Sequence, residues 1–328
     1  MVQRPDEDTL IARYLAPLAS DPAAFNLTDD AACLAVPPGH ELVITTDALV
    51  AGVHFFADDP PALIARKALR TNLSDLAAKG ARPRAYLLTL ALPDAWDEAW
   101  LADFVTGLAL DQKHFEVSLL GGDTTRAAGP LTLSITALGL VPVGKMVRRK
   151  GAQAGDRVFV TGTIGDAAFG CRMRLEPARF ATMPTDHRAH LLQRYLLPQP
   201  RHALAQVLQA HASAAMDVSD GLAGDCAKLC RASGVSATLD VARVPLSNAA
   251  RALCGAGTDM LQLALSGGDD YEILFTVAPD RCSPLMADAR AADVAVSEIG
   301  TIVAGSALPR FVHEGGVLSF TTTSFSHF

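Results

Sequence analysis

The segment LVITTD (42–47) is an apolar, β-branched run that ends on a carboxylate, which is the pattern of a strand. Pro60-Pro61 then opens a helical pattern that continues to about Lys79, with one apolar stripe and one polar stripe. A second strand-like run, YLLTLAL (86–92), is stopped by a proline. The two stripes of the helix consist of Leu69, Leu73 and Leu76 on the apolar side and of Asn72, Asp75 and Lys79 on the polar side.

The same alternation of strands and helices continues to about residue 141. Asp94 is placed to cap a helix that runs to about His114. The run VSLL (117–120) leads into Gly121-Gly122-Asp123, and the next strand is expected over 131–141. Strands that alternate with helices in this way indicate a layered α/β or α+β unit.

A change in composition separates the two halves of the chain. Residues 148–156 are basic and then glycine-rich, which is typical of a domain junction. Residues 177–190 are irregular and polar, which suggests a surface insertion. The remaining segments alternate between strand patterns at Arg157–Thr161, Ala214–Asp217, Ala237–Val241, Leu261–Leu265 and Ile273–Val277 and helical patterns at Leu222–Ala232 and Pro279–Ala292.

Length and composition bound the class of protein. With 328 residues the chain exceeds a usual single domain, and we predict an α/β (α+β) fold with two layered domains, 1–147 and 148–328. A net charge of −7 argues against a nucleic-acid-binding protein, which needs a basic face. The start lacks an apolar signal core, and no segment approaches the length of a membrane span. The six cysteines show no CxxC pairing and are expected to be reduced, so we predict a cytoplasmic protein.

Acidic residues at the ends of apolar runs are the most informative feature of the chain. Single acids such as Asp94 and Asp166 are interpreted as helix caps or turn formers, whereas Asp29-Asp30, Asp123 and Asp269-Asp270 gain little from capping. Two carboxylates about 4 Å apart repel by roughly 4 kcal/mol at an effective dielectric constant of about 20. A convergent cluster would therefore bind cations or protonate in part. Hard oxygen ligands suit Mg²⁺, and Mg²⁺ suits a nucleotide phosphate, so the pattern predicts a phosphoryl-transfer enzyme.

Three further motifs have structural explanations beside the functional ones. Gly162–Asp166 could present backbone amides to an anion, but it lacks both common nucleotide-binding patterns, and an ordinary strand-to-helix turn is favoured. Arg148-Arg149-Lys150 could hold ATP phosphates or form a solvated linker, and the two interpretations are about even. His54 stands alone, and a lone histidine is more often a structural group than a ligand.

Taken together, these motifs resemble the thiamine-monophosphate kinases, a family in the superfamily of aminoimidazole ribonucleotide synthetase. The resemblance covers nearly the whole chain, and its most specific parts are NLSDLAAKGA (72–81) and SGGDDYE (266–272). The other matching segments are ITTDALVAGVHF (44–55), GGDTTR (121–126), KGAQAGDRVFVTGTIGDAAFG (150–170) and MDVSDGL (216–222).

The resemblance implies an architecture and a reaction. It implies a homodimer in which the N-terminal sheets pair into a shared barrel, with a C-terminal α/β domain alongside. It also implies ATP as phosphoryl donor, several Mg²⁺ ions, and thiamine monophosphate as the acceptor that becomes thiamine diphosphate. Residues 1–147 would then bind metal and ATP and dimerise, while residues 148–328 would carry a tail that contacts substrate.

By position, the resemblance also implies four groups of site residues, of which the first is a subset of the metal ligands. Asp47, Asp75 and Asp123 would be the catalytic centre. The implied metal ligands are Asp30, Thr45, Thr46, Asp47, Asp75, Asp123, Asp217 and Asp220. The implied ATP contacts are Gly122, Asp123, Arg149 and Ser219, and the implied substrate contacts are His54, Asp269 and Phe325.

The chain departs from the family pattern at two places. Thr28 precedes Asp29-Asp30 where the family usually has glycine, which would reshape that loop without removing a carboxylate. The tail reads Phe325-Ser326-His327-Phe328. An aromatic ring is thus kept for stacking on the thiamine rings, while the usual tail hydroxyl and carboxylate are lost.

Two alternative functions stay open at the level of the sequence. The first is another ATP-dependent enzyme of the superfamily, similar to aminoimidazole ribonucleotide synthetase or to selenophosphate synthetase. The latter needs a reactive cysteine in a glycine-rich N-terminal segment, and this N-terminus has none. The second is a non-catalytic regulator that binds Mg-nucleotide.

The expected kinase reaction needs no general base. A phosphate acceptor with a second pKa of about 6 is largely dianionic at pH 7, and this favours direct in-line transfer.

Overall fold

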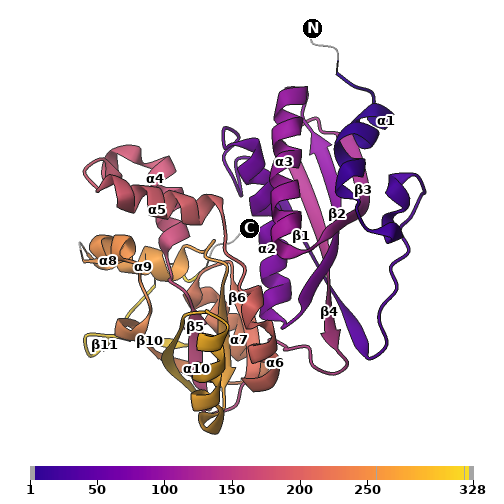
Figure 1. The fold of residues 1–328 in the computed structure, drawn as a ribbon. Helices are drawn as coiled ribbons and strands as arrows, with labels where there is room; N and C mark the ends of the chain where they lie inside the picture. The colour runs from indigo at the N-terminus through magenta and orange to yellow at the C-terminus, as the bar shows by residue number, and fades with distance from the viewer. Residues whose placement is uncertain (1–3, 256, 321, 325–328) are drawn as a thin grey trace. The chain divides into compact units, whose positions relative to one another are not determined.

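The structure is a computed structural model that describes residues 4–255, 257–320 and 322–324. The chain divides into two compact units, Met1–Leu76 with Ala81–Gly144 and Ala77–Gly80 with Lys145–Phe328. Each unit has its own sheet and its own apolar core, which confirms the predicted mixed α/β class (Figure 1). Among the described residues, no helix combines the length and the apolar character needed to cross a membrane.

The sheet of the first unit has the strand order β1-β4-β2-β3. β1 and β2 pair antiparallel with β4, and β3 pairs parallel with β2. Valine and leucine at alternate positions face the core, and in β1 these are Val43 and Leu49. The strands of this unit are β1 (His40–Val50), β2 (Arg82–Leu92), β3 (Ser118–Arg126) and β4 (Thr132–Pro142).

Two long helices, α2 (Pro61–Ala78) and α3 (Glu98–Phe115), cover one face of this sheet (Figure 1). The predicted leucine stripe of α2 is fully buried there, together with Phe104 of α3. Asp97 caps α3, and its carboxylate accepts from the Trp100 amide at 2.8 Å, so the predicted cap at Asp94 was wrong. The N-terminal segment adds α1 (Glu7–Leu10) and the short turns Ile11–Leu15, Ala16–Leu18 and Pro22–Leu27.

The sheet of the second unit is mixed, with the order β11-β10-β7-β9-β5-β8-β6. Most neighbours are antiparallel, and the pair β7 and β10 is parallel. The central strands are apolar on both faces because helices cover both sides. The strands are β5 (Arg157–Thr161), β6 (Ala212–Val218), β7 (Ser236–Asp240), β8 (Glu272–Val277), β9 (Val296–Val303), β10 (Arg310–His313) and β11 (Gly316–Val317).

The helices of this unit form two layers and a separate cluster. α7 (Leu222–Ser233) packs on one face of the sheet, and α6 (Ala205–His211) and α10 (Cys282–Ala291) pack on the other. A further apolar cluster joins α4 (Asp166–Leu175), α5 (Thr185–Leu196), α8 (Asn248–Cys254) and α9 (Thr258–Ser266) (Figure 1). Short turns lie at Pro177–Phe180, His202–Leu204, Val241–Arg243 and Pro279–Arg281.

Two predictions for this unit were wrong. Residues 261–265 were predicted as a strand, but they lie within α9, because an apolar run of that length fits either element and packing against α4 and α7 favours the helix. Residues 177–190 were predicted as an irregular insertion, yet α5 begins at Thr185. That helix buries Leu191 and Tyr195, which stand four residues apart on one side.

Candidate functional site

In the first unit, β1 and α2 are joined through side chains that the sequence marked as site residues. Thr45 Oγ1 donates a hydrogen bond to Asp75 Oδ2 at 2.6 Å. One turn earlier on the helix, Asn72 Oδ1 accepts from the backbone N–H of Asp47 at 2.9 Å. β1 is an edge strand, so Asn72 satisfies an amide that no further strand covers. Asn72 and Asp75 of the predicted polar stripe therefore face β1, where a hydroxyl and a carboxylate lie side by side.

Asp47 lies on the helix-covered face of the sheet. Side chains alternate along a strand, so Thr45 and Asp47 share a face with buried Val43 and Leu49. The hydrogen bonds of β1 to α2 agree with this placement. Three of the predicted site residues, Thr45, Asp47 and Asp75, are thus brought together by one strand and one helix.

Asp123 lies on the opposite face of the same sheet. It pairs in register with Thr89, an exposed residue of β2 whose neighbours on both sides are buried among the helices. Thr46 is also on this open face, where Thr136 Oγ1 lies 3.0 Å from Thr46 Oγ1. The first unit by itself therefore does not bring Asp123 to Asp47 and Asp75.

The backbone beside Asp123 requires glycine. Gly122 has a φ of +152°, and a Cβ at this position would lie 1.7 Å from the carbonyl oxygen of Leu88. At Gly121 the nearest atom to a Cβ would be a flexible Leu87 methyl group at 3.6 Å. At the predicted ATP contact Gly122, β3 therefore lies too close to β2 for a side chain, and Asp123 lies inside β3 rather than after it.

His54 and Asp30 occupy loops of the first unit. His54 Nδ1 accepts from the Val50 amide at 3.0 Å, so the neutral ring carries its proton on Nε2. Asp30 is exposed, and its backbone N–H donates to Asp29 Oδ1 at 2.7 Å. These contacts shape the two loops locally and leave the roles of both side chains as predictions.

In the second unit, the segments 217–221 and 266–272 meet in adjacent loops. The backbone N–H of Asp269 donates to the Ser219 carbonyl at 2.8 Å, and that of Tyr271 donates to the Val218 carbonyl at 2.8 Å. Gly268 has a φ of +77°, and a Cβ there would lie 2.4 Å from the Ser219 carbonyl oxygen. The predicted ATP contact at Ser219 and the predicted substrate contact at Asp269 are therefore neighbours.

Asp217 and Asp220 belong to the first of these loops and differ in their surroundings. Asp217 is buried at the end of β6, whereas Asp220 forms a close ion pair with Lys228 of α7. Lys228 also contacts the fully buried Asp225 at 2.8 Å, and Asp225 Oδ2 accepts from the Asp220 amide at 2.9 Å. Burial raises the pKa of Asp225 above its ordinary value, although Lys228 opposes this.

A carboxylate occupies the N-terminus of α4, where the sequence suggested a possible anion cradle. Both carboxylate oxygens of Asp270 lie 2.9 Å from the Gly165 amide nitrogen, and Asp270 is only 1% exposed. The amides of Gly162 and Ile164 donate to the carbonyls of residues 295 and 245. Burial raises the pKa of the Asp270 carboxyl well above its usual range. This turn is thus closed from within the protein, as the ordinary strand-to-helix interpretation predicted.

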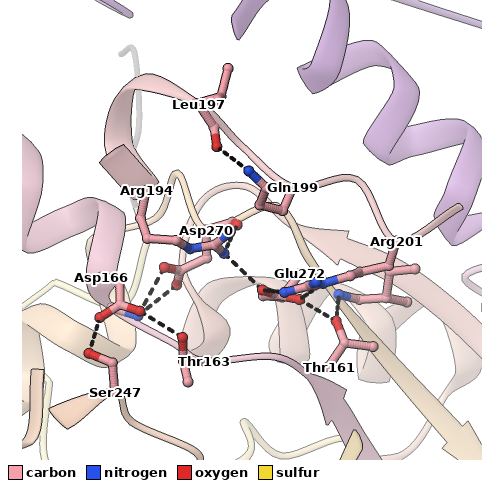
Figure 2. Close-up of polar contacts among 12 residues, drawn as sticks. Thr161, Thr163, Asp166, Arg194, Leu197, Gln199, Arg201, Ser247, Asp270 and Glu272 are labelled. Carbon is pink, nitrogen blue, oxygen red and sulfur yellow. Dashed lines mark hydrogen bonds and ion pairs between the residues drawn. The ribbon is translucent and has the colours of Figure 1, made fainter. Parts of the chain in front are cut away.

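A buried ion cluster adjoins this turn (Figure 2). Glu272 is fully buried and accepts from Arg194 Nη2 at 2.8 Å, from Arg201 Nη2 at 2.5 Å and from Thr161 Oγ1 at 2.5 Å. Next to it, Asp166 accepts from Thr163 at 2.6 Å and from Ser247, so its side chain is a structural anchor as well as part of the first turn of α4.

The sequence predictions missed Arg194 and Arg201. Arg194 lies on α5, in the region interpreted partly as a surface insertion, and Arg201 follows it in a loop. The only available signal was the spacing of Leu191, Arg194 and Tyr195 on one helical side. No pattern in the sequence connects these arginines to Glu272, which lies more than 70 residues further along the chain.

Arg149, Phe325 and the predicted metal ligands are the remaining predicted site residues. Arg149 is exposed in the loop before β5, and Phe325 lies outside the described residues. Within the described part of each unit, no group of three or more His, Cys, Asp or Glu side chains is close enough to hold a metal ion. The predicted ligands are nonetheless all carboxylate or hydroxyl oxygens, and the close Thr45–Asp75 pair supplies the donor chemistry that Mg²⁺ prefers.

Comparison with known families and proteins covers almost the whole chain. The model of the AIR synthase related protein, N-terminal domain, matches residues 28–141, and that of the C-terminal domain matches residues 153–312. The thiamine-monophosphate kinase of Caulobacter vibrioides is 44% identical over 311 residues, covering 94% of this chain and 87% of the relative. That of Salmonella typhimurium is 40% identical over 324 residues, covering 98% of each.

Solved structures of thiamine-monophosphate kinases are also similar to this chain. The crystal structure of thiamine-monophosphate kinase from Stenotrophomonas maltophilia K279a aligns with a TM-score of 0.80 at 41% identity, covering 88% of this chain and 91% of that chain. The structure of AaThiL complexed with AMPPCP and TMP aligns with a TM-score of 0.77 at 28% identity, covering 98% and 94%.

Proposed function

Because this chain belongs to the AIR synthase related family, and within it to the thiamine-monophosphate kinases, we propose that it phosphorylates thiamine monophosphate with ATP. A phosphate oxygen of thiamine monophosphate forms a bond to the γ-phosphorus, and the bond from that phosphorus to the bridging oxygen breaks. The products are thiamine diphosphate and ADP. The observation that carries the proposal is the similarity over 98% of the chain to a structure that holds AMPPCP, an ATP analogue, together with TMP.

Mg²⁺ is part of the proposal, and the donor set supports it. The residues proposed to hold the ions are Asp30, Thr45, Thr46, Asp47, Asp75, Asp123, Asp217 and Asp220. When bound, Mg²⁺ would neutralise charge on the ATP phosphates and on the leaving group. Thr45 keeps one Asp75 oxygen oriented through its 2.6 Å hydrogen bond, and Asn72 fixes the backbone at Asp47.

The protein's own residues are proposed to position the two anions for in-line transfer. Gly122, Asp123, Arg149 and Ser219 would contact ATP. His54 can donate from Nε2, since its Nδ1 accepts from the Val50 amide, and Asp269 carries a negative charge that suits the cationic thiazolium ring. Phe325 is retained as a stacking contact. No covalent enzyme intermediate is needed, because the acceptor is already a strong anionic nucleophile.

We also propose the homodimer implied by the family. The open face of the sheet in the first unit carries Ile44 at 60% exposure and Leu87 at 37% exposure, which supports its burial against a second copy. Asp123 lies on this face, so its contribution is expected to depend on the dimer. Residues 1–147 are proposed to bind metal and ATP and to dimerise, and residues 148–328 to contact substrate. We expect a cytoplasmic enzyme without membrane partners, and the net charge of −7 argues against nucleic-acid partners.

A panel of phosphorylated acceptors tests the proposal. The purified protein is incubated with Mg-ATP and each acceptor, ADP release is followed, and products are identified by mass. Release that depends on thiamine monophosphate, with thiamine diphosphate as the product, is the expected result. Release that depends instead on an amide substrate or on selenide would assign the chain to another activity of the superfamily. Nucleotide binding without turnover of any acceptor would favour a regulator.

A further inference from the structure

The loop that carries Asp269 has an unusual backbone. Between α9 and β8, Gly268, Asp269 and Tyr271 have φ values of +77°, +66° and +51°. Asp269 and Tyr271 are L residues, for which this left-handed region is unfavourable. Such a conformation persists only when the surroundings impose it, and it is typical of ligand-binding positions.

Three sets of contacts impose this backbone. The amides of Asp269 and Tyr271 are tied to the carbonyls of residues 219 and 218. The carboxylate of Asp270 is fixed on the Gly165 amide. At the end of the loop, Glu272 is held by the guanidinium groups of residues 194 and 201 (Figure 2).

Arg194 connects two of these contacts. Its Nη2 lies 2.8 Å from Glu272 Oε1 and 3.3 Å from the backbone carbonyl oxygen of Asp270. One side chain thus contacts Asp270 and Glu272, the residues on either side of the left-handed Tyr271. Arg201 holds the other side of the same carboxylate, with 2.7 Å between Nε and Glu272 Oε2.

The ion cluster around Glu272 fixes the orientation of its side chains more than it adds to the free energy of unfolding. Glu272 is fully buried and meets two guanidinium groups, whose side chains are 10% and 27% exposed. Buried ion pairs recover little net stability because desolvation opposes the Coulomb attraction, whereas a bidentate fork fixes orientation closely. A fixed orientation is of use here because the same loop carries the proposed substrate contact Asp269.

We propose that Glu272, Arg194 and Arg201 are positioning residues that hold Asp269 in the conformation that binds thiamine monophosphate. This inference rests on the proposed function. None of the three needs to touch substrate, because they act through the backbone of residues 268–271.

The test combines steady-state kinetics with amide hydrogen exchange on the full-length protein. Glu272→Gln keeps the shape of the side chain but removes the charge that binds both arginines. It should raise the KM for thiamine monophosphate about tenfold while changing kcat and the KM for ATP by less than about twofold. Exchange should speed up in residues 266–272. Arg194→Lys, which keeps the charge but loses the fork, should show a smaller effect in the same direction.

Arg70→Lys is the matched control. Arg70 forms a buried bidentate pair with Asp111, at 2.6 and 2.9 Å, in the first unit. The Arg70→Lys substitution should lower the melting temperature of the protein without a selective change in the KM for thiamine monophosphate. If Glu272→Gln behaves like this control in both kinetics and exchange, the positioning role is refuted.

The two proposals fail in different ways. A wild-type protein that releases no ADP with thiamine monophosphate refutes the proposed substrate, and the positioning of the loop is then judged on exchange alone. A wild-type protein that is active, with a Glu272→Gln variant of unchanged KM, refutes the positioning role and leaves the function intact. If Glu272→Gln does not fold, the positioning role is tested with Arg194→Lys instead, by the KM for thiamine monophosphate and by amide exchange in residues 266–272.

Discussion

Thr45 on β1 donates its hydroxyl to the Asp75 carboxylate on α2, with 2.6 Å between Oγ1 and Oδ2. Because the two residues come from different elements, this bond fixes the helix against the edge strand at the proposed metal site. It also leaves the carboxylate in a defined orientation, as a metal ligand requires.

Asp75→Asn should abolish turnover and leave the fold intact. The amide still accepts from Thr45, but it removes the negative charge that a metal ligand supplies, so we expect kcat to fall by about a thousandfold. The measurement is ADP release with thiamine monophosphate, alongside thermal unfolding. Asp97→Asn is the control, because asparagine still caps α3 and activity should stay normal. Near-normal activity of Asp75→Asn would contradict the metal scheme.

Gly122→Ala and Gly121→Ala should differ sharply although they are neighbours. The alanine Cβ at 122 would meet the Leu88 carbonyl oxygen at 1.7 Å, in a backbone region unfavourable to L residues. We expect a loss of about 3 kcal/mol in the free energy of unfolding. The alanine at 121 meets only a leucine methyl group at 3.6 Å and should cost less than about 1 kcal/mol. Urea denaturation of both variants checks this, and equal losses would contradict a close approach of β3 to β2 at Gly122.

Ile44→Glu should weaken the proposed homodimer. Ile44 is 60% exposed on the open face of the sheet, and burying an unpaired carboxylate there would oppose pairing of two sheets. We expect dimerisation to weaken by about tenfold or more, as measured by size-exclusion chromatography with light scattering. Leu110→Glu is the control, since Leu110 is 53% exposed but lies on α3, which covers the other face. An unchanged dimer in Ile44→Glu would rule out pairing through this face.

The stability of the protein should depend on pH through Asp270. Burial raises its pKa above the ordinary value of 3.8, so the folded state keeps a proton that the unfolded state has lost. This contribution to the free energy of unfolding is fully present below 3.8 and declines as the pH rises toward the raised pKa. Asp270→Asn lacks it, so the stability of the variant relative to wild type should improve with rising pH. Urea denaturation between pH 4 and 8 measures this, and a constant difference across that range would contradict it.

Much of the architecture could be predicted because local patterns were unambiguous. Arg157–Thr161 was predicted as a strand with the bounds that β5 has, since its residues after Arg157 are all β-branched or aromatic and glycine-containing turns flank the run. Leu261–Leu265 was mistaken because its helical character depends on neighbours that are distant in the sequence. Local preference decided the first case and tertiary packing decided the second.

Candidate site residues could be named from the sequence, but their geometry could not. The register of β3 against β2 shifts between Tyr86 and Leu87, which leaves Leu120 as an extra residue. A shift of one position moves every later side chain to the other face, so this bulge decides where Asp123 lies. No sequence pattern marks the bulge. The Glu272 cluster was missed for a similar reason, because its arginines come from a helix and a loop far from it in the chain.

The position of the Asp270 side chain at the start of α4 has a consequence for inhibitor design. The Gly165 amide at that helix start already donates to a buried side chain of the protein itself. Sulfonates, carboxylates or phosphonates designed to dock at this glycine turn, by analogy with other nucleotide-binding proteins, would compete with a tethered group at very high local concentration. Compounds aimed at this enzyme are better directed elsewhere in the second unit, at the turn where Ser219 meets Asp269.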